Sequence, residues 1–428
     1  MPARVVSRRR LLALCGAGLA SGLLGGTIAR GNAHEHRSAD PAEPLRIGMV
    51  LPLRSGGMPM DANTLELAGE AARKGALMAE EDYGRLAAAG RRDLEVLVAS
   101  APDAQSTQRA GQRLAASGEV SALAGGIGRD QALALGRVAE EWGIPFVNIG
   151  SASEALRDPG CGSHTFHVEA SAAMYLQVLV DAHPDTGRWF LAYSDDEEGR
   201  ALLGRTRQLV ATAGGSEAGS LALDGPAGHP AMLEAIRQSD ADTVLMLTDW
   251  RNQLDFLGRY QADYQAEEMR PTISGFPYPV TQTRDFLDSL VRAAPSRGVG
   301  PRVSLWEPAE TPGAVALGES FLARWGVPMD PPAWAAYIAV ELVAGAAATA
   351  GSLAGEAIVA ELDRSSVTVE AHKGGRTGFR SGDRQLRQPL YVIRPDPRAA
   401  SRREFVRVVE PSNEATDAGA QPDPAREC

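Results

Sequence analysis

From residue 45 onward the chain alternates between short apolar segments typical of buried strands and longer segments with the apolar spacing of helices. The first series has expected strands at 45–51, 94–99, 121–124 and 145–149 and expected helices at 65–83, 104–116 and 130–142. A strand–helix–strand order of this kind makes neighbouring strands parallel and covers both faces of the sheet with helices. The pattern therefore predicts a doubly wound α/β domain.

A second series of the same kind follows. Its expected strands are 189–193, 220–223, 243–247, 272–274 and 303–306, and its expected helices are 172–182, 198–213, 230–238 and 253–262. Helical patterns at 318–325, 333–350 and 358–364 come next, and short strand patterns at 390–393 and 405–409 close the series. Because 428 residues exceed what one hydrophobic core usually holds, the two series predict two lobes.

The helical pattern at 333–350 is apolar nearly all round, as a membrane span would be. Glu341 lies within it, however, and Pro331-Pro332 sets its start. These residues favour a buried helix of a globular protein over a span. We therefore expect a protein that is not embedded in the membrane.

The first 33 residues resemble an export signal. Ser7-Arg8-Arg9-Arg10 precedes an apolar run over 11–28, a pattern typical of twin-arginine (Tat) leaders. Small residues at Gly31 and Ala33 would allow cleavage after Ala33. An uncleaved anchor and a lipid attached at Cys15 are the alternatives, although five glycines weaken the run as a span. We expect a periplasmic protein exported through a Tat-like signal.

The charge of the chain argues against nucleic acid as a partner. The formal net charge is −11, even though the first 33 residues hold five arginines and no acid. The rest of the chain is therefore more acidic still, and it would repel phosphate backbones and anionic lipid surfaces.

The sequence offers little chemistry for catalysis or metal binding. Its three cysteines, Cys15, Cys161 and Cys428, form no zinc-type pair, and a bridge between Cys161 and Cys428 stays open. His164 and His167 would point to opposite faces of an extended segment. The sequence has no P-loop and no Gly-x-Ser-x-Gly motif. We expect no cofactor, no metal site and no enzymatic activity.

Several segments together resemble the branched-chain amino acid and amide group of periplasmic binding proteins, the leucine-binding-protein-like receptors of ABC transporters. They are residues 46–53, 75–81, 124–129, 138–147, 378–380 and 383–392. The resemblance runs in register from about Leu45 to about Ile393. It implies a type I periplasmic-binding-protein fold, with two doubly wound parallel-sheet lobes that close on a ligand like a hinge. Three crossovers would join the lobes, near 166–169, 306–308 and 379–383.

The resemblance also divides the chain. After the signal at 1–33 and a spacer at 34–44, the N-terminal lobe would comprise 45–167 and 307–378. The C-terminal lobe would comprise 168–306 and 379–409, and 410–428 would be a disordered tail.

Open parallel sheets bind ligands beyond the carboxyl ends of their strands, which here are specific loops. The candidate ligand-binding residues in these loops are Arg54, Ser55, Arg129, Asp130, Asn148, Ser151 and Ser153 on the first lobe and Tyr193, Glu198, Asp249, Trp250 and Tyr278 on the second. Arg129 stands where amino-acid binders of the family often have a hydroxyl residue, and Glu198 stands where an aromatic residue is common.

These departures leave two interpretations of Arg129 open. It could hold a ligand carboxylate in a bidentate manner, with Glu198 or Asp249 holding an amine. Alternatively, Arg129 caps or pairs with Asp130 on a solvated helix start. Trp250 and Tyr278 would supply apolar walls, or else pack within their own lobe.

The implied function is that of a receptor for a small polar or carboxylate-bearing solute, such as an amino acid, an amide or an organic acid. The receptor would deliver the solute to the permease and ATPase subunits of an ABC importer. A ligand-sensing domain of the same fold in a signalling system is the main alternative, and a periplasmic enzyme is a further one.

Overall fold

The computed structural model describes residues 43–53, 64–87, 92–157, 163–185, 187–263, 271–293, 299–308, 311–364, 368–396, 398 and 406–412. Several of the sequence-based predictions lie outside these residues. They are the export signal with most of the spacer, the candidates Arg54 and Ser55, and the cysteine pair Cys161 and Cys428.

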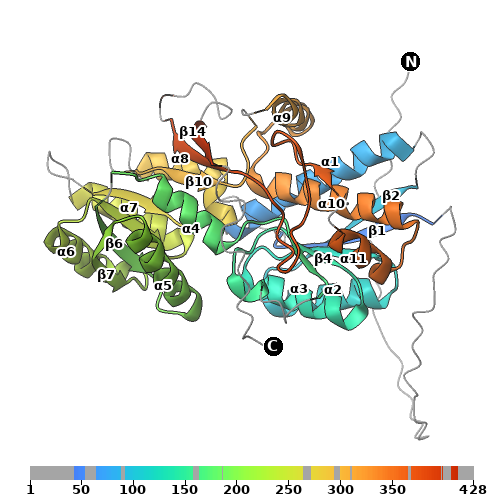
Figure 1. Ribbon diagram of the computed structural model, residues 1–428, viewed down its shortest axis with the longest axis horizontal. Helices are drawn as coiled ribbons and strands as arrows, with labels where there is room; N and C mark the ends of the chain where they lie inside the picture. Colours follow the sequence, from blue (N-terminus) through green and yellow to red (C-terminus); the bar gives the residue numbers. More distant parts are fainter. Residues whose placement is uncertain are drawn as a thin grey trace, which may run out of the picture. The chain divides into compact units, whose positions relative to one another are not determined.

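The first sheet has five parallel strands in the order β2-β1-β3-β4-β5. Its strands are β1 (Leu45–Leu51), β2 (Leu94–Ser100), β3 (Ala122–Gly125), β4 (Phe146–Asn148) and β5 (Thr165–His167). Its helices are α1 (Thr64–Ala87), α2 (Ala104–Ala116) and α3 (Arg129–Trp142), drawn in blue to teal in Figure 1. The strand interiors are buried apolar runs, as expected for a parallel sheet covered on both faces.

Alternate residues of these strands point to two different cores. Ile47, Met49 and Val147 belong to the cluster that α1 shares, whereas Val50 and Phe146 belong to the cluster beneath α2 and α3. This alternation is the two-residue period of a strand, and it places a separate helical layer on each face.

The second sheet has four parallel strands in the order β7-β6-β8-β9. Its strands are β6 (Arg188–Tyr193), β7 (Ser216–Ala222), β8 (Thr243–Leu247) and β9 (Thr272–Gly275). The helices of this lobe are α4 (Ala172–Asp181), α5 (Glu197–Thr212), α6 (His229–Ser239), α7 (Trp250–Asp263) and α8 (Arg284–Ala293), and its short 3₁₀ turns are η2 (Pro226–Gly228) and η3 (Pro279–Gln282). Figure 1 shows this lobe in green to yellow.

An antiparallel sheet β10-β13-β14 adjoins the second lobe, because Val299 forms a parallel bridge with Ile273 of β9. Its strands are β10 (Arg302–Ser304), β13 (Leu390–Pro395) and β14 (Val406–Ser412). The remaining elements are the turn η1 (Glu154–Leu156), the hairpin β11 (Val369–Glu370) with β12 (Arg376–Thr377), and the helices α9 (Pro312–Trp325), α10 (Pro331–Ala350) and α11 (Gly355–Asp363).

Helix α10 packs on the first lobe against α1, β1 and β3. Helices α1 and α10 approach so closely that a Cβ added to Gly75 of α1 would lie 1.9 Å from the backbone oxygen of Ala333 in α10. Among the described residues, α10 is the one helix long and apolar enough to cross a membrane, and 72% of its most apolar window is buried inside the protein. Its apolar composition therefore matches the predicted role of a core helix.

The predicted alternation of strands and helices is confirmed, and β1, α2 and β8 have the predicted bounds. Several helices begin earlier than predicted. Before two of them a preceding side chain acts as a cap: Thr311 accepts the Ala314 N–H before α9, and Asp249 accepts the Arg251 N–H before α7. Helix α8 was not predicted. The predicted tail from residue 410 is wrong at its start, because β14 runs to Ser412 and pairs with β13.

Candidate ligand-binding site

The loop after β3 leads directly into α3, whose first-turn N–H groups receive no side-chain cap. Gly125 and Gly126 have φ of 143° and 77°, and a Cβ at Gly125 would lie 2.2 Å from the backbone oxygen of Val50. Gly128 is the N-cap of α3 and offers no side chain to the first-turn N–H groups. The start of α3 is therefore suited to an anionic or carbonyl oxygen.

Arg129 links the two lobes at this point. Its Nη2 donates to Oε2 of Glu197, the first residue of α5, over 3.0 Å. The pair is unevenly exposed, with 26% of the Arg129 side chain and 81% of the Glu197 side chain accessible. The hydrogen bond to Glu197 raises the pKa of Arg129. Arg129 thus pairs with Glu197 on the opposite lobe and not with Asp130, the next residue in the chain. Asp130 is exposed and forms no ion pair among the described residues.

Glu198 is partly buried beside this pair. Burial raises the pKa of Glu198, and the nearby Asp196, Asp130 and Glu197 raise it further against the opposing effect of Arg129. Within the described part of the chain, no hydrogen bond or ion pair satisfies its carboxylate. These shifts place residues from the starts of α3 and α5 within electrostatic reach of one another.

A pocket of about 410 Å³ contains Arg129, Glu197 and Glu198. Ser153 borders it from the first lobe, and Arg205 borders it two helical turns along α5. Both lobes therefore contribute charged side chains to one hollow at the carboxyl ends of their strands.

The other candidates in the loop after β4 serve mainly to shape that loop. The Asn148 side chain accepts the N–H groups of Gly150 and Ser151 and donates to the Ser151 backbone oxygen over 2.8 Å. Asn148 and Ser151 are buried, and the Ser151 hydroxyl accepts the Ser153 N–H. Of these candidates, Ser153 is the one that borders the pocket.

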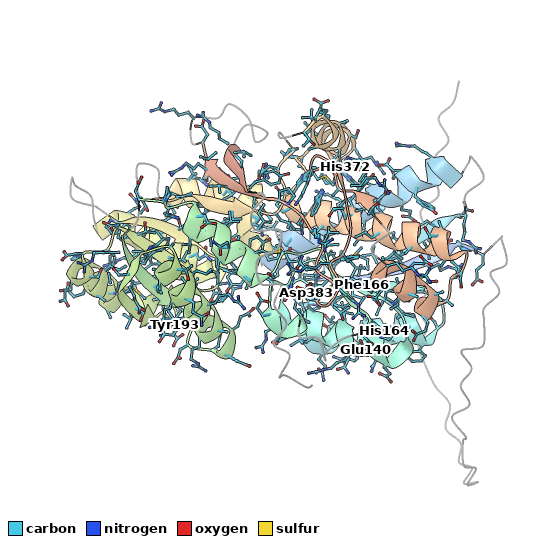
Figure 2. All side chains as sticks on the ribbon, in the orientation of Figure 1. Glu140, His164, Phe166, Tyr193, His372 and Asp383 are labelled. Carbon is cyan, nitrogen blue, oxygen red and sulfur yellow. The ribbon has the colours of Figure 1, made fainter. Side chains whose placement is uncertain are left out.

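The second-lobe candidates have varied surroundings. Both oxygens of Asp249 are occupied at the start of α7, by the N–H groups of Arg251 and Asn252 and by the Asn252 amide. Partly buried Trp250 lies 5.0 Å from the Arg251 guanidinium carbon. Tyr193 is partly buried at the end of β6, and Figure 2 shows it on the second lobe.

Tyr278 lies closer to the carboxylates of the cleft. Its ring packs at 4.9 Å on Phe276. Burial raises the pKa of its phenol, and Glu198, Asp196 and Asp249 act in the same direction. Tyr278 thus lies within electrostatic reach of Glu198, although it does not line the pocket that holds Glu198.

The sequence analysis missed a buried arginine, Arg157, that bonds to residues in and near two of the proposed crossovers. Arg157 donates to the backbone oxygens of Ser151, Ser153 and Glu169 and to Oε1 of Gln385. Gln385 in turn donates to the backbone oxygen of His167. Arg157 had no motif to reveal it, because its bond to Gln385 spans 228 positions and its other acceptors are backbone oxygens, which the sequence does not mark.

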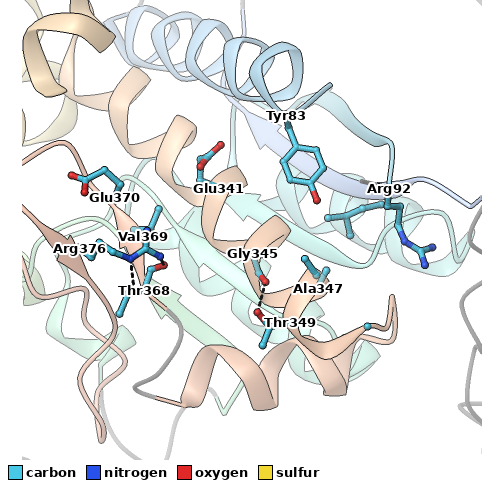
Figure 3. A pocket seen from close by; sticks show the side chains of 13 residues that line it. Tyr83, Arg92, Glu341, Gly345, Ala347, Thr349, Thr368, Val369, Glu370 and Arg376 are labelled. Atoms are coloured by element: carbon cyan, nitrogen blue, oxygen red, sulfur yellow. Dashed lines mark hydrogen bonds between the residues drawn. The ribbon is translucent and has the colours of Figure 1, made fainter. Parts of the chain in front are cut away.

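Two further pockets are less suited to a solute. The larger, of about 640 Å³, is lined by Leu45 at the amino end of β1, opposite to the strand ends where such sheets bind ligands. Figure 3 shows it between Tyr83, Glu341 of α10 and Arg376. A pocket of about 420 Å³ on the second lobe holds the carboxylates of Asp195, Asp196, Asp224, Asp249 and Asp255.

The histidines singled out in the sequence do not come together. His164 pairs with Glu140 over 2.9 Å, a contact whose two residues Figure 2 labels, and the buried His167 faces the Asn148 amide. Among the residues that the structure describes, no group of three His, Cys, Asp or Glu side chains is placed to hold a metal ion.

Two doubly wound lobes with polar residues gathered at the facing strand ends define a two-lobed ligand-binding protein. The chain belongs to the periplasmic binding protein family, whose model matches residues 44–400. The family resemblance in the sequence and the type I fold are thereby confirmed. No curated protein matches the sequence.

Solved structures share the fold at low sequence identity. An ABC transporter substrate-binding protein from Sphaerobacter thermophilus has a TM-score of 0.73 and 20% identity, with 88% of this chain and 100% of that chain covered. A leucine binding protein from Thermotoga maritima has a TM-score of 0.70 and 15% identity, with coverages of 86% and 99%. A solute binding protein from R. palustris in complex with benzoate has a TM-score of 0.70 and 17% identity, with coverages of 90% and 99%.

Proposed function

We propose that this protein is an exported receptor that captures a small polar or carboxylate-bearing solute between its lobes and delivers it to the permease and ATPase of an ABC importer. The observation that carries the proposal is that Arg129, at the start of α3, lines one pocket with Glu197 and Glu198, at the start of α5. Facing strand ends of two parallel sheets are where such folds hold their ligands. The protein binds its solute and does not transform it.

The relatives support a solute of this kind. The Thermotoga protein is described as a leucine binding protein, and the R. palustris protein holds benzoate. Both ligands carry a carboxylate, which the start of α3 and Arg129 would accept here.

The proposed lobe boundaries follow the sequence-based division. The first lobe takes 45–167 and 307–378, and the second takes 168–306 and 379–409, extended through β14. The packing of α10 on α1 supports the return of the chain to the first lobe, and the pairing of β13 with β10 supports its final return to the second.

A ligand screen tests the receptor proposal. We expect one or a few compounds among amino acids, short amides, organic acids and aromatic acids to raise the melting temperature, because a ligand that binds the folded state stabilises it by mass action. Calorimetry and recovery of the unchanged compound would follow each hit. A complete screen without a hit, or a chemically altered hit, would contradict the proposal.

We further propose that the leader directs export by the twin-arginine route. Replacing Arg8 and Arg9 by Lys should leave the protein in the cytoplasm, as measured by cell fractionation, because a receptor reads the arginine pair. The matched control replaces Arg4 and Arg30 instead, and continued export of the Arg8/Arg9 variant would argue for the general secretory route.

A further inference from the structure

A lysine from the part of the chain proposed for the first lobe bonds to residues proposed for the second. The sequence contains two lysines, and one of them, Lys373, lies between β11 and β12. Its partly buried ammonium donates to the backbone oxygens of Leu305 and Pro389 and, over 2.7 Å, to Oε1 of Gln388. Because a lysine has three N–H donors only as an ammonium ion, these three bonds require its charged form.

The acceptors of Lys373 lie beside the proposed crossovers. Leu305 directly follows β10 and adjoins the second crossover, and Pro389 directly precedes β13, the strand that pairs with β10. Gln388, a buried residue that follows the third crossover, donates from Nε2 to the backbone oxygen of Val168 in the first, over 2.6 Å. Lys373 therefore joins the ends of two paired strands and, through Gln388, bonds indirectly to the first crossover.

A second chain of hydrogen bonds returns from Leu305 to the first proposed crossover. The N–H of Leu305 donates to Oε1 of Gln282 over 2.6 Å. The Gln282 amide donates to the Tyr175 hydroxyl, which donates to Oε1 of Glu169. Because Val168 and Glu169 are consecutive, the two chains form a closed ring of bonds in or beside all three proposed crossovers.

The loop that carries Lys373 is fixed to the first lobe. The Trp334 indole of α10 donates to the backbone oxygen of Ala371 over 3.0 Å, and the Thr311 hydroxyl donates to that of His372 over 2.8 Å. His372, which Figure 2 labels, has φ of 58°, a left-handed conformation that is uncommon for a residue with a side chain. Such a conformation persists where its surroundings enforce it, and here it directly precedes Lys373.

Two aromatic rings flank the ammonium of Lys373. It lies 4.0 Å from the ring centre of Trp334 in α10 and 5.6 Å from that of Tyr391 in β13. Burial lowers the pKa of Lys373, and the carboxylate of Glu169 opposes that shift. The three oxygen acceptors and the faces of the two rings stabilise the charged form.

We propose that Lys373 is a positioning residue that restricts the relative movement of the two lobes about the crossovers. This inference rests on the proposed receptor function, in which the lobes close over a solute. Lys373 does not line the pocket that holds Arg129, so it acts on binding through the lobes and not through contact with the solute. Without its ammonium the lobes adopt a wider range of positions. Binding then weakens, because a smaller fraction of the protein has the form that binds.

Interlobe distances in the ligand-free protein test the proposal. Spin labels at Arg109→Cys on α2 and Glu234→Cys on α6, two exposed positions on different lobes, report the distance by double electron–electron resonance. The three native cysteines are replaced by Ser in this background. Lys373→Met keeps the apolar stem under the Trp334 ring and removes the ammonium. We expect its distance distribution to be at least twice as wide as that of the labelled parent.

Two further variants complete the comparison. Lys74→Met, on α1, removes the only other lysine and should leave the distribution unchanged. Gln388→Met removes the bond between Lys373 and Gln388 and the bond to Val168, so it should widen the distribution by a smaller factor. A folded Lys373→Met with a lower melting temperature but an unchanged distribution would overturn the proposal, since its role would then be only structural. If Lys373→Met does not fold, an unchanged distribution in Gln388→Met would overturn the proposal.

Calorimetry measures the consequence for binding. It uses those screened compounds, L-leucine and benzoate first, that raise the melting temperature of the wild type. Each should bind Lys373→Met at least threefold more weakly than Lys74→Met, and equal affinities would also overturn the proposal. If no compound of the whole screen binds, the receptor proposal fails, whereas the interlobe distances still decide the role of Lys373.

Discussion

The cleft and the proposed crossovers both contain charged residues, yet the surroundings of these residues differ. Arg129 in the cleft is 26% exposed and makes one interlobe ion pair, with an Nε that has no partner. Arg157, beside the proposed crossovers, is buried and donates to four oxygens, one of them on the distant Gln385. Buried charges with every partner in place hold a structure together, whereas unbalanced charges at an opening are available to a ligand.

The same contrast holds for the carboxylates. Glu169, in the first proposed crossover, accepts the Tyr175 hydroxyl over 2.6 Å, and Glu307, in the second, pairs with Arg284 over 2.6 Å. All four residues are buried. Glu198 and Asp130 in the cleft have no such partners among the described residues. A cleft variant that loses stability but not binding, or a variant near the proposed crossovers that loses binding but not stability, would contradict this comparison.

The largest expected effect is on stability at the crossovers. Arg157→Ala would leave Oε1 of Gln385 without its donor and would remove the charged hydrogen bonds to the backbone oxygens of Ser151, Ser153 and Glu169. We therefore expect a loss of about 3–5 kcal/mol in the free energy of unfolding. Denaturant unfolding measures it. Arg129→Ala is the matched control, and an equal loss in both variants would remove the distinction between the two regions.

A smaller effect concerns the pH dependence of stability. Burial raises the pKa of Glu169 from its ordinary 4.5 to about 7. The folded state therefore holds this proton more tightly than the unfolded state, and its contribution is complete below about pH 4.5 and is lost as the pH rises through about 7. Glu169→Gln should remove a pH-dependent loss on the order of 2–3 kcal/mol between pH 4.5 and 7.5.

Unfolding curves at several pH values measure this difference. Asp330, whose pKa burial raises to about 6, contributes a loss of the same sign and remains in the Glu169→Gln variant as an internal reference. If the free energy of unfolding changed with pH in the same way in the wild type and the variant, the prediction would be wrong. Glu169 would then already be ionised in the folded protein at neutral pH.

The smallest effect on stability, and the clearest on binding, is expected at Arg129. Arg129→Ala should weaken a carboxylate-bearing solute by about 1.5–3 kcal/mol, because a charged hydrogen bond is lost. Unfolding should change by less than about 1 kcal/mol, since the ion pair with Glu197 is exposed. Calorimetry and melting curves on one preparation give both numbers, and unchanged affinity would place Arg129 outside the pocket.

The sequence predicted the parts of the fold that local patterns encode. The spacing of apolar residues predicts strand β1 and helix α2, and the N-cap Asp103 marks the start of α2. Helix α8 carries the same kind of signal in Phe286, Leu287 and Leu290, but it is short and follows a proline-rich turn.

The candidate site was predicted less completely, because its contacts join distant segments. The loops after β3 and β6 could be selected from strand ends alone, which brought Arg129 and Glu198 into the prediction. The contact of Arg129 with Glu197 spans 68 positions and that of Arg157 with Gln385 spans 228. Only the folded chain reveals such pairs, and it also shows that Asn148 and Asp249 are engaged within their own loops.

Two indole rings connect one crossover with the first lobe. Trp306, beside the second proposed crossover, stacks on Trp334 of α10 with ring centroids 5.5 Å apart and planes at 11°. The ammonium of Lys373 lies 4.0 Å from the Trp334 ring centre. Because emission from stacked indoles depends on their overlap and on nearby charge, hinge movement upon capture of a solute should change the intrinsic fluorescence. The receptor would thus carry a built-in optical reporter of its own closure, readable without any attached dye.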